Sequence, residues 1–363
     1  MKKSLIALAV LGAFAGAASA QSSVTLYGIV DVNVQRTDPD AGTSGGCGAT
    51  NPGCDATTGL NSGHLAGNRW GLRGSEDLGG GMRAIFQLES GYSLDNGTSA
   101  QGGRLFGRQA YAGLAGGFGT LVAGRLATFS SGTGSFDKFG TIDPFRTGYG
   151  IGGMQSTFSS ANATRFDNTI AYVTPTMGGF SAGIGHTFRV NGSENAGGSS
   201  NNNNGQIMYA NFSAGPLYVV LTYDRIKLGE VAGDPTEKHL QIGAAYDLKV
   251  VRLSAGYAKE DDVFALSTTP QQAAGSDATA WIIGVAAPFG PHRLAASYQK
   301  RDVDSFGTTP EGDRKVWQVG YEYSLSRRTT FYASYADLTD NGSLKTATSG
   351  GAKQITAGLF HSF

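Results

Sequence analysis

Hydrophobic and polar residues alternate with a period of two along much of the chain. In residues 24–35 the even positions are apolar or glycine, and the odd positions are mostly polar. Similar alternation recurs in residues 69–75, 82–89, 239–246 and 251–257. Successive side chains of a β-strand point to opposite faces of its sheet, so this pattern predicts strands with one apolar and one polar face.

The connections between these strands fall into two classes that alternate along the chain. Seven are short turns, at residues 76–81, 115–119, 175–179, 214–216, 247–249, 288–291 and 325–328. Eight are long and polar, at residues 36–67, 91–103, 126–163, 189–204, 226–238, 260–276, 301–314 and 337–353. Seven turns and eight loops join sixteen strands. Short turns on one side and long loops on the other are typical of bacterial outer-membrane barrels.

The predicted fold is therefore all-β: a closed, sixteen-stranded antiparallel transmembrane β-barrel with short periplasmic turns and long extracellular loops. Closure is required because lipid cannot satisfy the backbone groups of a free sheet edge. Sixteen strands enclose a lumen too wide for side chains to fill, so it should hold water. The pattern leaves open which face of residues 104–114 points inward. A soluble lectin-like β-protein is the alternative fold class, and recovery without detergent would support it.

The chain begins with a predicted signal peptide, residues 1–20. Lys2 and Lys3 precede an apolar stretch at residues 5–15, which is followed by a small-residue cleavage site, residues 18–20. The remaining residues, 21–363, are predicted to form one barrel domain. Removing the two lysines from the 28 basic residues leaves 26 against 28 acidic ones, and nothing in this balance suggests nucleic-acid binding.

The composition favours strands over helices, and the chain contains two cysteines that could form a disulfide. Glycine supplies 56 of the 363 residues, and charged residues make up only 15%. The two cysteines, Cys47 and Cys54, lie in an exported segment rich in Gly, Thr and Asn, where a local disulfide is the natural interpretation. A metal-binding pair is the rival, but no histidine or second cysteine pair is nearby. No cofactor or metal is predicted.

The last strand carries a separate signal. Ile355, Ala357, Leu359, His361 and Phe363 share one face, and Phe363 is the final residue of the sequence. A strand that ends in phenylalanine resembles the signature by which bacterial barrels are recognised for membrane assembly.

Five stretches distributed along the mature chain resemble a known family. They are residues 24–28 (VTLYG), 68–79 (NRWGLRGSEDLG), 106–114 (FGRQAYAGL), 117–125 (from GFGT to GR) and 358–363 (GLFHSF). In these motifs and their order, the chain resembles the general trimeric porins of β-proteobacteria, the Gram-negative porins of the Neisseria, Bordetella and Burkholderia type.

The resemblance implies a homotrimer in the outer membrane of a Gram-negative bacterium. It implies a water-filled channel for passive diffusion of small hydrophilic solutes and ions. The expected partners are outer-membrane lipids and lipopolysaccharide, and, during assembly, periplasmic chaperones and the barrel-assembly machinery. The third loop, residues 126–163, would fold into the lumen as a constriction. Its length agrees with that role, and a surface-exposed flap is the alternative.

Selectivity in such a pore depends on its radius and on the charges at its narrowest section. An excess of arginine on the wall favours anions, although each arginine could instead pair with an acid such as Asp31 or Glu89. Arg104 and Arg108 are weaker candidates than the other arginines. The seven candidate residues at the constriction or in the lumen are Arg69, Arg73, Arg83, Arg108, Arg125, Asp137 and Asp143.

No enzyme is predicted. Residues 42–46 and 179–183 match the G-x-S-x-G string, but nucleophile-elbow chemistry requires a strand, a tight turn and a helix around the serine. The first match lies in a loop and the second within an alternating strand. The main alternative function is an adhesin or surface antigen that works through the long loops. Stable, large conductance steps in planar bilayers would separate a pore from such a protein.

Overall fold

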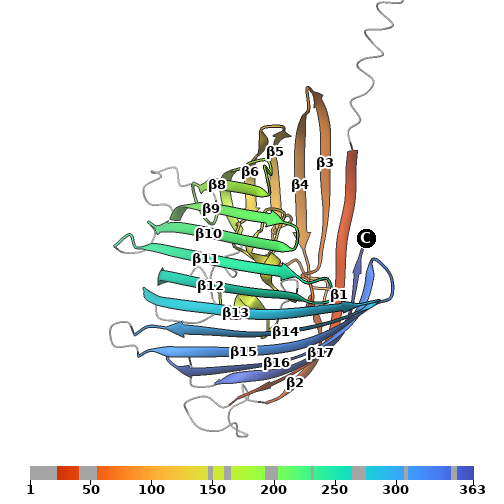
Figure 1. Ribbon diagram of the computed structural model, residues 1–363, viewed down its shortest axis with the longest axis vertical. Helices are drawn as coiled ribbons and strands as arrows, with labels where there is room; N and C mark the ends of the chain where they lie inside the picture. Colours follow the sequence, from red (N-terminus) through yellow and green to blue (C-terminus); the bar gives the residue numbers. More distant parts are fainter. Residues whose placement is uncertain are drawn as a thin grey trace, which may run out of the picture.

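The computed structural model describes residues 23–40, 55–145, 150–158, 165–192, 203–229, 233–263, 275–305, 310–344 and 350–363. These residues form mainly strands of a single antiparallel sheet (Figure 1). In this part of the chain, no helix is long and apolar enough to cross a membrane. The predicted signal peptide and both Cys47 and Cys54 lie outside the described residues.

The sheet contains seventeen strands within the described residues. In chain order they are β1 (Ser23–Pro39), β2 (Thr57–Ser62), β3 (Arg69–Gly79), β4 (Met82–Gly91), β5 (Gln109–Gly116), β6 (Gly119–Ala127), β7 (Arg165–Val173), β8 (Phe180–Thr187), β9 (Asn203–Ala214), β10 (Leu217–Leu228), β11 (Thr236–Asp247), β12 (Arg252–Val263), β13 (Ser276–Phe289), β14 (His292–Val303), β15 (Gly312–Ser324), β16 (Thr329–Gly342) and β17 (Gly351–Ser362).

From β3 to β17 each strand pairs with the next, and β1 pairs with both β17 and β3, which closes the ring. Strands β2 and β3 pair with different halves of β1, so they share one place in the ring. The barrel therefore has sixteen strand positions, and the predicted sixteen-stranded closed barrel is confirmed. One detail was wrong: the first long loop is interrupted, because residues 57–62 return to the sheet as β2.

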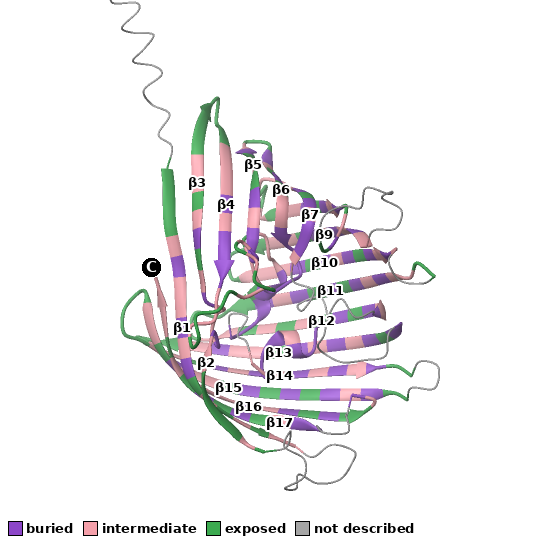
Figure 2. Ribbon diagram, turned by 180° about the vertical axis from the view of Figure 1, so that it is seen from behind, coloured by how far each residue is buried: buried purple, intermediate pink, exposed green. Residues whose placement is uncertain are grey.

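Apolar side chains face outward from the barrel, and polar ones face inward. On β1, Val24, Leu26 and Val34 are 63%, 60% and 55% exposed, whereas Asp31 and Asn33 are buried. Figure 2 shows the same alternation of buried and exposed residues along β10 to β17. An apolar outer face is what a barrel in lipid requires, because no water is present there to solvate polar groups.

The first and last strands meet at a tightly packed seam. Phe363 and Gly28 exchange two backbone hydrogen bonds, of 3.1 and 3.0 Å. The Phe363 ring lies against Gly28 so closely that a Cβ at this position would overlap it. In Figure 1 the C-terminus accordingly lies beside β1. The small residue in the mature-start motif and the terminal aromatic residue are therefore one packing unit.

The third loop folds into the barrel in both of its described parts, residues 128–145 and 150–158. It contains two short 3-10 helices, η2 (Phe139–Ile142) and η3 (Met154–Ser156). Its apolar side chains are completely buried against inward side chains of β10, β12 and β13. The cluster consists of Phe139, Ile142, Met154, Phe158, Val220, Ala258, Ala280 and Ile282. The third loop thus folds inward, as predicted, and the hydrophobic effect holds it there.

Glycines on the inner face make room for this loop. A Cβ at Gly284 or Gly320 would lie 2.7 Å from Pro144 or Phe145 respectively. A Cβ at Gly256 would overlap Ile142. These strands therefore present a smooth inner surface to the loop, on which its bulky side chains lie directly against backbone.

Candidate pore constriction

Side chains of the barrel wall hold the third loop in place by hydrogen bonds to its backbone. Each donates to a loop carbonyl, and at Gly152, Ser156 and Thr157 this satisfies an acceptor in a buried contact. The donor–acceptor distances run from 2.7 to 3.1 Å. The pairs are Tyr218 with Lys138, Arg252 with Thr141, Gln299 with Gly152, Arg301 with Thr157 and Arg314 with Ser156. The loop is therefore anchored along β10, β12, β14 and β15.

The opposite side of the loop is tied to β4 and β5. Ser135 donates from its hydroxyl to Gln87 at 2.7 Å and from its backbone amide to Gln109 at 2.9 Å. Arg108 donates to the Thr133 hydroxyl at 3.2 Å. The loop thus spans the lumen, with contacts on both sides, and divides the space inside the barrel.

A cavity of about 420 Å³ remains between this loop and the wall. Two arginines, Arg69 of β3 and Arg252 of β12, line it from strands about halfway around the ring from each other. The other lining residues are Ile29, Ala66, Gly132, Thr133, Gly134, Asp137, Gly140, Thr141 and Asp143. The cavity is therefore bounded by two basic wall residues, by glycine-rich loop backbone and by the two loop acids, Asp137 and Asp143.

The contacts of the two arginines are partly to neutral groups. Arg69 donates from Nε to the carbonyl of Gly67 at 2.9 Å. Arg252 donates from Nη2 to the carbonyl of Thr141 at 2.7 Å. A carbonyl orients a guanidinium without cancelling its charge, so these contacts hold positive charge at the cavity.

The two loop carboxylates are engaged with the loop's own backbone. Asp137 accepts hydrogen bonds from the amides of Gly132, at 2.8 Å, and Gly140, at 3.1 Å. Burial raises the pKa of Asp137 to about 7, so this carboxyl is only partly ionised at neutral pH. Asp143 accepts from the amide of Phe145 at 2.8 Å. Both acids therefore shape the turn around η2 as well as lining the cavity.

Arg108 forms a buried ion pair on the inner wall. Its Nε donates to Glu89 Oε1 at 2.7 Å, and both side chains are almost completely buried. Glu89 also accepts from the hydroxyl of Tyr27 at 2.9 Å. Together with the bond to Thr133, these contacts make Arg108 a support for the loop. Arg108 is therefore paired with an acid, Glu89, which was the alternative interpretation of the wall arginines.

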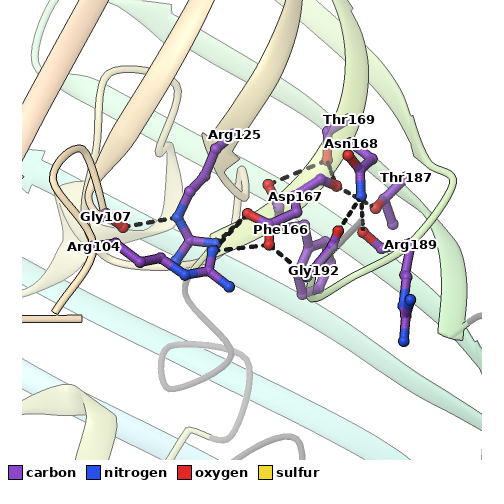
Figure 3. A network of polar contacts seen from close by, with 10 residues as sticks. All are labelled: Arg104, Gly107, Arg125, Phe166, Asp167, Asn168, Thr169, Thr187, Arg189 and Gly192. Carbon is purple, nitrogen blue, oxygen red and sulfur yellow. Dashed lines mark hydrogen bonds and ion pairs between the residues drawn. The ribbon is translucent and has the colours of Figure 1, made fainter. Parts of the chain in front are cut away.

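Arg125 belongs to a different cluster, at the ends of β6 and β7 (Figure 3). It donates to Asp167 at 2.6 Å and to the carbonyl of Gly107 at 2.8 Å. Arg104 binds the same carboxylate at 2.8 Å, and the amide of Gly192 donates to it at 2.7 Å. The cluster joins the second loop to β6, β7 and the segment after β8, and it is separate from the residues that line the cavity.

Arg73 and Arg83 lie on β3 and β4 with exposed side chains. The Arg73 guanidinium lies 5.2 Å from the ring centre of Tyr27, a cation–π contact. Arg83 is close to the β3–β4 turn, opposite Asp77 in the ladder. Of the seven candidates, the structure thus brings Arg69, Asp137 and Asp143 together at one cavity.

Sequence reasoning missed Arg252 and Ala66 at this cavity. Arg252 is the inward residue at the start of an alternating strand, which is a detectable signal, but nothing local indicates that the third loop reaches it. Within the described residues, no group of three or more His, Cys, Asp or Glu side chains could hold a metal ion.

Comparisons of the sequence and of the structure with known proteins all find porins. The model of the Gram-negative porin family matches residues 7–343. An outer membrane porin protein of Bordetella pertussis is 38% identical, over 93% of this chain and 94% of its own. One of Delftia acidovorans is 34% identical, over 93% and 90%. The solved structure of an anion-selective porin from Comamonas acidovorans is similar with a TM-score of 0.72 and 28% identity, over 94% of this chain and 100% of that one.

Proposed function

The chain belongs to the Gram-negative porin family, and on this basis we propose that it is an anion-preferring channel whose solutes pass between the third loop and the arginines Arg69 and Arg252. As a family member it is an outer-membrane porin, which allows passive diffusion of small hydrophilic solutes and ions. Family and relatives indicate a channel rather than an enzyme. The proposal adds the location of the narrow section and the sign of its charge.

The observation that carries this proposal is the placement of Arg69 and Arg252 at one cavity, on well-separated strands. The acids there compensate only in part, because Asp137 has a pKa of about 7 and is partly protonated at neutral pH. Fixed positive charge at a narrow section raises the local anion concentration and repels cations. The similarity to a porin described as anion-selective supports the same sign.

The reversal potential in a potassium chloride gradient tests this proposal. The purified protein is inserted into a planar bilayer, and the voltage at zero current is measured with unequal salt on the two sides. An anion-preferring channel gives a potential shifted toward that of chloride. A potential shifted toward that of potassium would contradict the proposed sign. Arg73, Arg83, Arg108 and Arg125 are proposed to contribute less than Arg69 and Arg252.

A homotrimer is the proposed assembly. The solved structure of an outer membrane protein of Vibrio cholerae, described as a trimer form, shares the fold with a TM-score of 0.64 at 15% identity. Light scattering of the detergent-solubilised protein should give three times the mass of one chain after subtraction of detergent. A single-chain mass would contradict the assembly.

The remaining sequence predictions are proposed on the same basis. Outer-membrane lipids and lipopolysaccharide would cover the apolar outer face, and periplasmic chaperones with the barrel-assembly machinery would insert the chain, using Phe363 as its terminal signature. Cleavage after Ala20 and a Cys47–Cys54 disulfide are both readable from the intact mass of the purified protein, before and after reduction and alkylation.

A further inference from the structure

The chain leaves the sheet between β2 and β3. On β1, only Val30 and Asp31 separate the residue that faces Ser62 from the residue that faces Arg69. On the other side of this gap the chain has the six residues Gly63–Asn68. An ordinary β-bulge adds one residue, so this excursion is much larger than a bulge. We call residues 63–68 the inner strap.

A single residue, Asp31, holds the inner strap at its start, middle and end. Its backbone carbonyl accepts from the amide of Gly63 at 3.0 Å and from the Asn68 side chain at 3.0 Å. Its backbone amide donates to the Asn68 side-chain oxygen. Its carboxylate accepts from the amides of Leu65 and Ala66, at 2.7 and 2.9 Å. These five hydrogen bonds fix the strap to β1.

The inner strap lies inside the barrel. Asp31 is completely buried and accepts a hydrogen bond of 2.5 Å from the hydroxyl of Tyr332, on β16. The His64 ring stacks on the Tyr332 ring at a centroid distance of 5.7 Å, and its Nε2 lies 2.8 Å from the Ser334 hydroxyl. On its other side His64 approaches the third loop, since a Cβ at Gly150 would lie 3.0 Å from His64 Cε1.

The inner strap therefore runs between the wall and the third loop, and its Ala66 lines the same cavity as Arg69 and Arg252. We propose that the inner strap is a second constriction element, which sets the width of the passage together with the third loop. Ala66 is the strap residue next to passing solutes, and Asp31 is the positioning residue that fixes the strap. This inference rests on the proposed passage between the third loop and the two arginines.

Cysteine modification at Ala66 tests the inference most directly. The variant A66C is inserted into planar bilayers and treated with methanethiosulfonate reagents, one carrying an ammonium group and one a sulfonate group. A group attached at the passage narrows it, so we expect both reagents to remove about half of the single-channel conductance. The wild-type chain, with Cys47 and Cys54, and the variant A214C at the exposed β9–β10 turn are the controls. Unchanged conductance in A66C, with a mass shift that shows modification, would overturn the proposal.

Substitution of Asp31 tests how the strap is positioned. In D31N one carboxylate oxygen is lost, so the strap should become mobile and open-channel current noise should rise by at least about twofold relative to wild type. The matched control D38N changes an exposed carboxylate of the same strand, and its noise should equal that of wild type. A folded D31N channel with wild-type noise would contradict the positioning role. If D31N does not fold, the conductance of modified A66C tests the proposal instead.

The two proposals fail in different ways. If R252Q shifts the reversal potential but modified A66C conducts normally, the strap inference is wrong and the passage stands. If neither variant changes conduction, the passage itself lies elsewhere and both proposals are wrong. A66W provides a reagent-free check, since its larger side chain should lower conductance whereas A66G should not.

Discussion

Two parts of the inner wall, both built from alternating strands, differ in what covers them. On β10 to β13 inward positions include Val220, Ala258 and Ile282, and the third loop buries them completely. On β1 and β4 inward positions include Asp31 and Gln87, and these polar groups bind the inner strap and the third loop through hydrogen bonds. Inward apolar residues cannot remain in contact with water at low free energy, so the chain covers them with its own loop.

This difference also decides where the passage lies. The loop packs on the glycine-lined surface of β11 to β15, where side chains such as Phe145 lie directly on backbone. The open space that remains is lined by Arg69 of β3, by Ala66 of the inner strap and, on the docking side, by Arg252 of β12. One wall thus serves as a docking surface for the loop, and the other provides much of the polar lining. The following variants separate these two roles, in order of expected effect.

The largest effect should come from a charge in the docked face of the loop. Phe139 is completely buried, and truncation of a buried Phe typically costs about 3–5 kcal/mol, with a further cost for an unpaired charge. F139D should therefore release the third loop and raise single-channel conductance. T141D adds the same charge at an exposed position of the same turn. We expect external protease to cut the loop in F139D but not in T141D. Intact loops in both variants would contradict docking by apolar burial.

A smaller effect should come from filling the glycine surface. A Cβ at Gly256 would overlap Ile142, and overpacking of this kind typically costs about 1–3 kcal/mol. G256A should therefore lower the thermal unfolding midpoint measured by circular dichroism. At Gly117, a Cβ would have no neighbour within 4 Å, so G117A serves as the control and should unfold as wild type does. Equal midpoints for the two variants would show that the loop does not rest on Gly256.

At the cavity between the two walls, loss of one arginine charge should change selectivity while the barrel still folds. A unit charge acting on an ion at roughly 4 Å in water contributes about 1 kcal/mol, equivalent to roughly a fivefold change in permeability ratio. R252Q should lower the chloride-to-potassium ratio by about this factor, and R252K should not. R73Q should have a smaller effect, and R125Q the least, because Arg125 is paired with Asp167. A shift in R125Q as large as that in R252Q would contradict this ranking.

The smallest effect should be a pH dependence of selectivity. Burial raises the pKa of Asp137 to about 7, so its carboxyl ionises as pH rises through this value and adds negative charge to the cavity. Anion preference should therefore fall by up to about twofold between pH 5 and pH 9. Burial lowers the pKa of His64 to about 4, so this ring stays neutral over that range. Reversal potentials of D137N should be flat with pH. If D137N and the wild type gave the same dependence of reversal potential on pH, Asp137 would not be the group that titrates.

The barrel was predictable from the sequence because its signals are local. Alternation within each strand, as in residues 24–35, depends on neighbouring positions, and loop lengths are read directly from the chain. The inner strap was not predictable in this way. Its position depends on the contact between Asp31 and Tyr332, which lie 301 residues apart in the chain. A pattern of period two carries no information on such contacts.

The candidate site was predictable only in part for the same reason. Strand alternation pointed both Arg69 and Arg125 inward and left the orientation of Arg108 open. It did not indicate that Arg108 pairs with Glu89 and Arg125 with Asp167. Whether an arginine faces solutes or a carboxylate depends on which strands and loops surround it. Arg252 was missed because its role follows from the third loop reaching β12.

The position of anions inside crystals of the protein would test the central claim most directly. Crystals grown in sodium bromide locate bromide by its anomalous scattering, without any change to the sequence. Bromide should bind in the cavity between the third loop, Arg69 and Arg252, in contact with at least one of the two guanidinium groups. Bromide ordered elsewhere in the lumen, with none in this cavity, would contradict the claim that anions pass there.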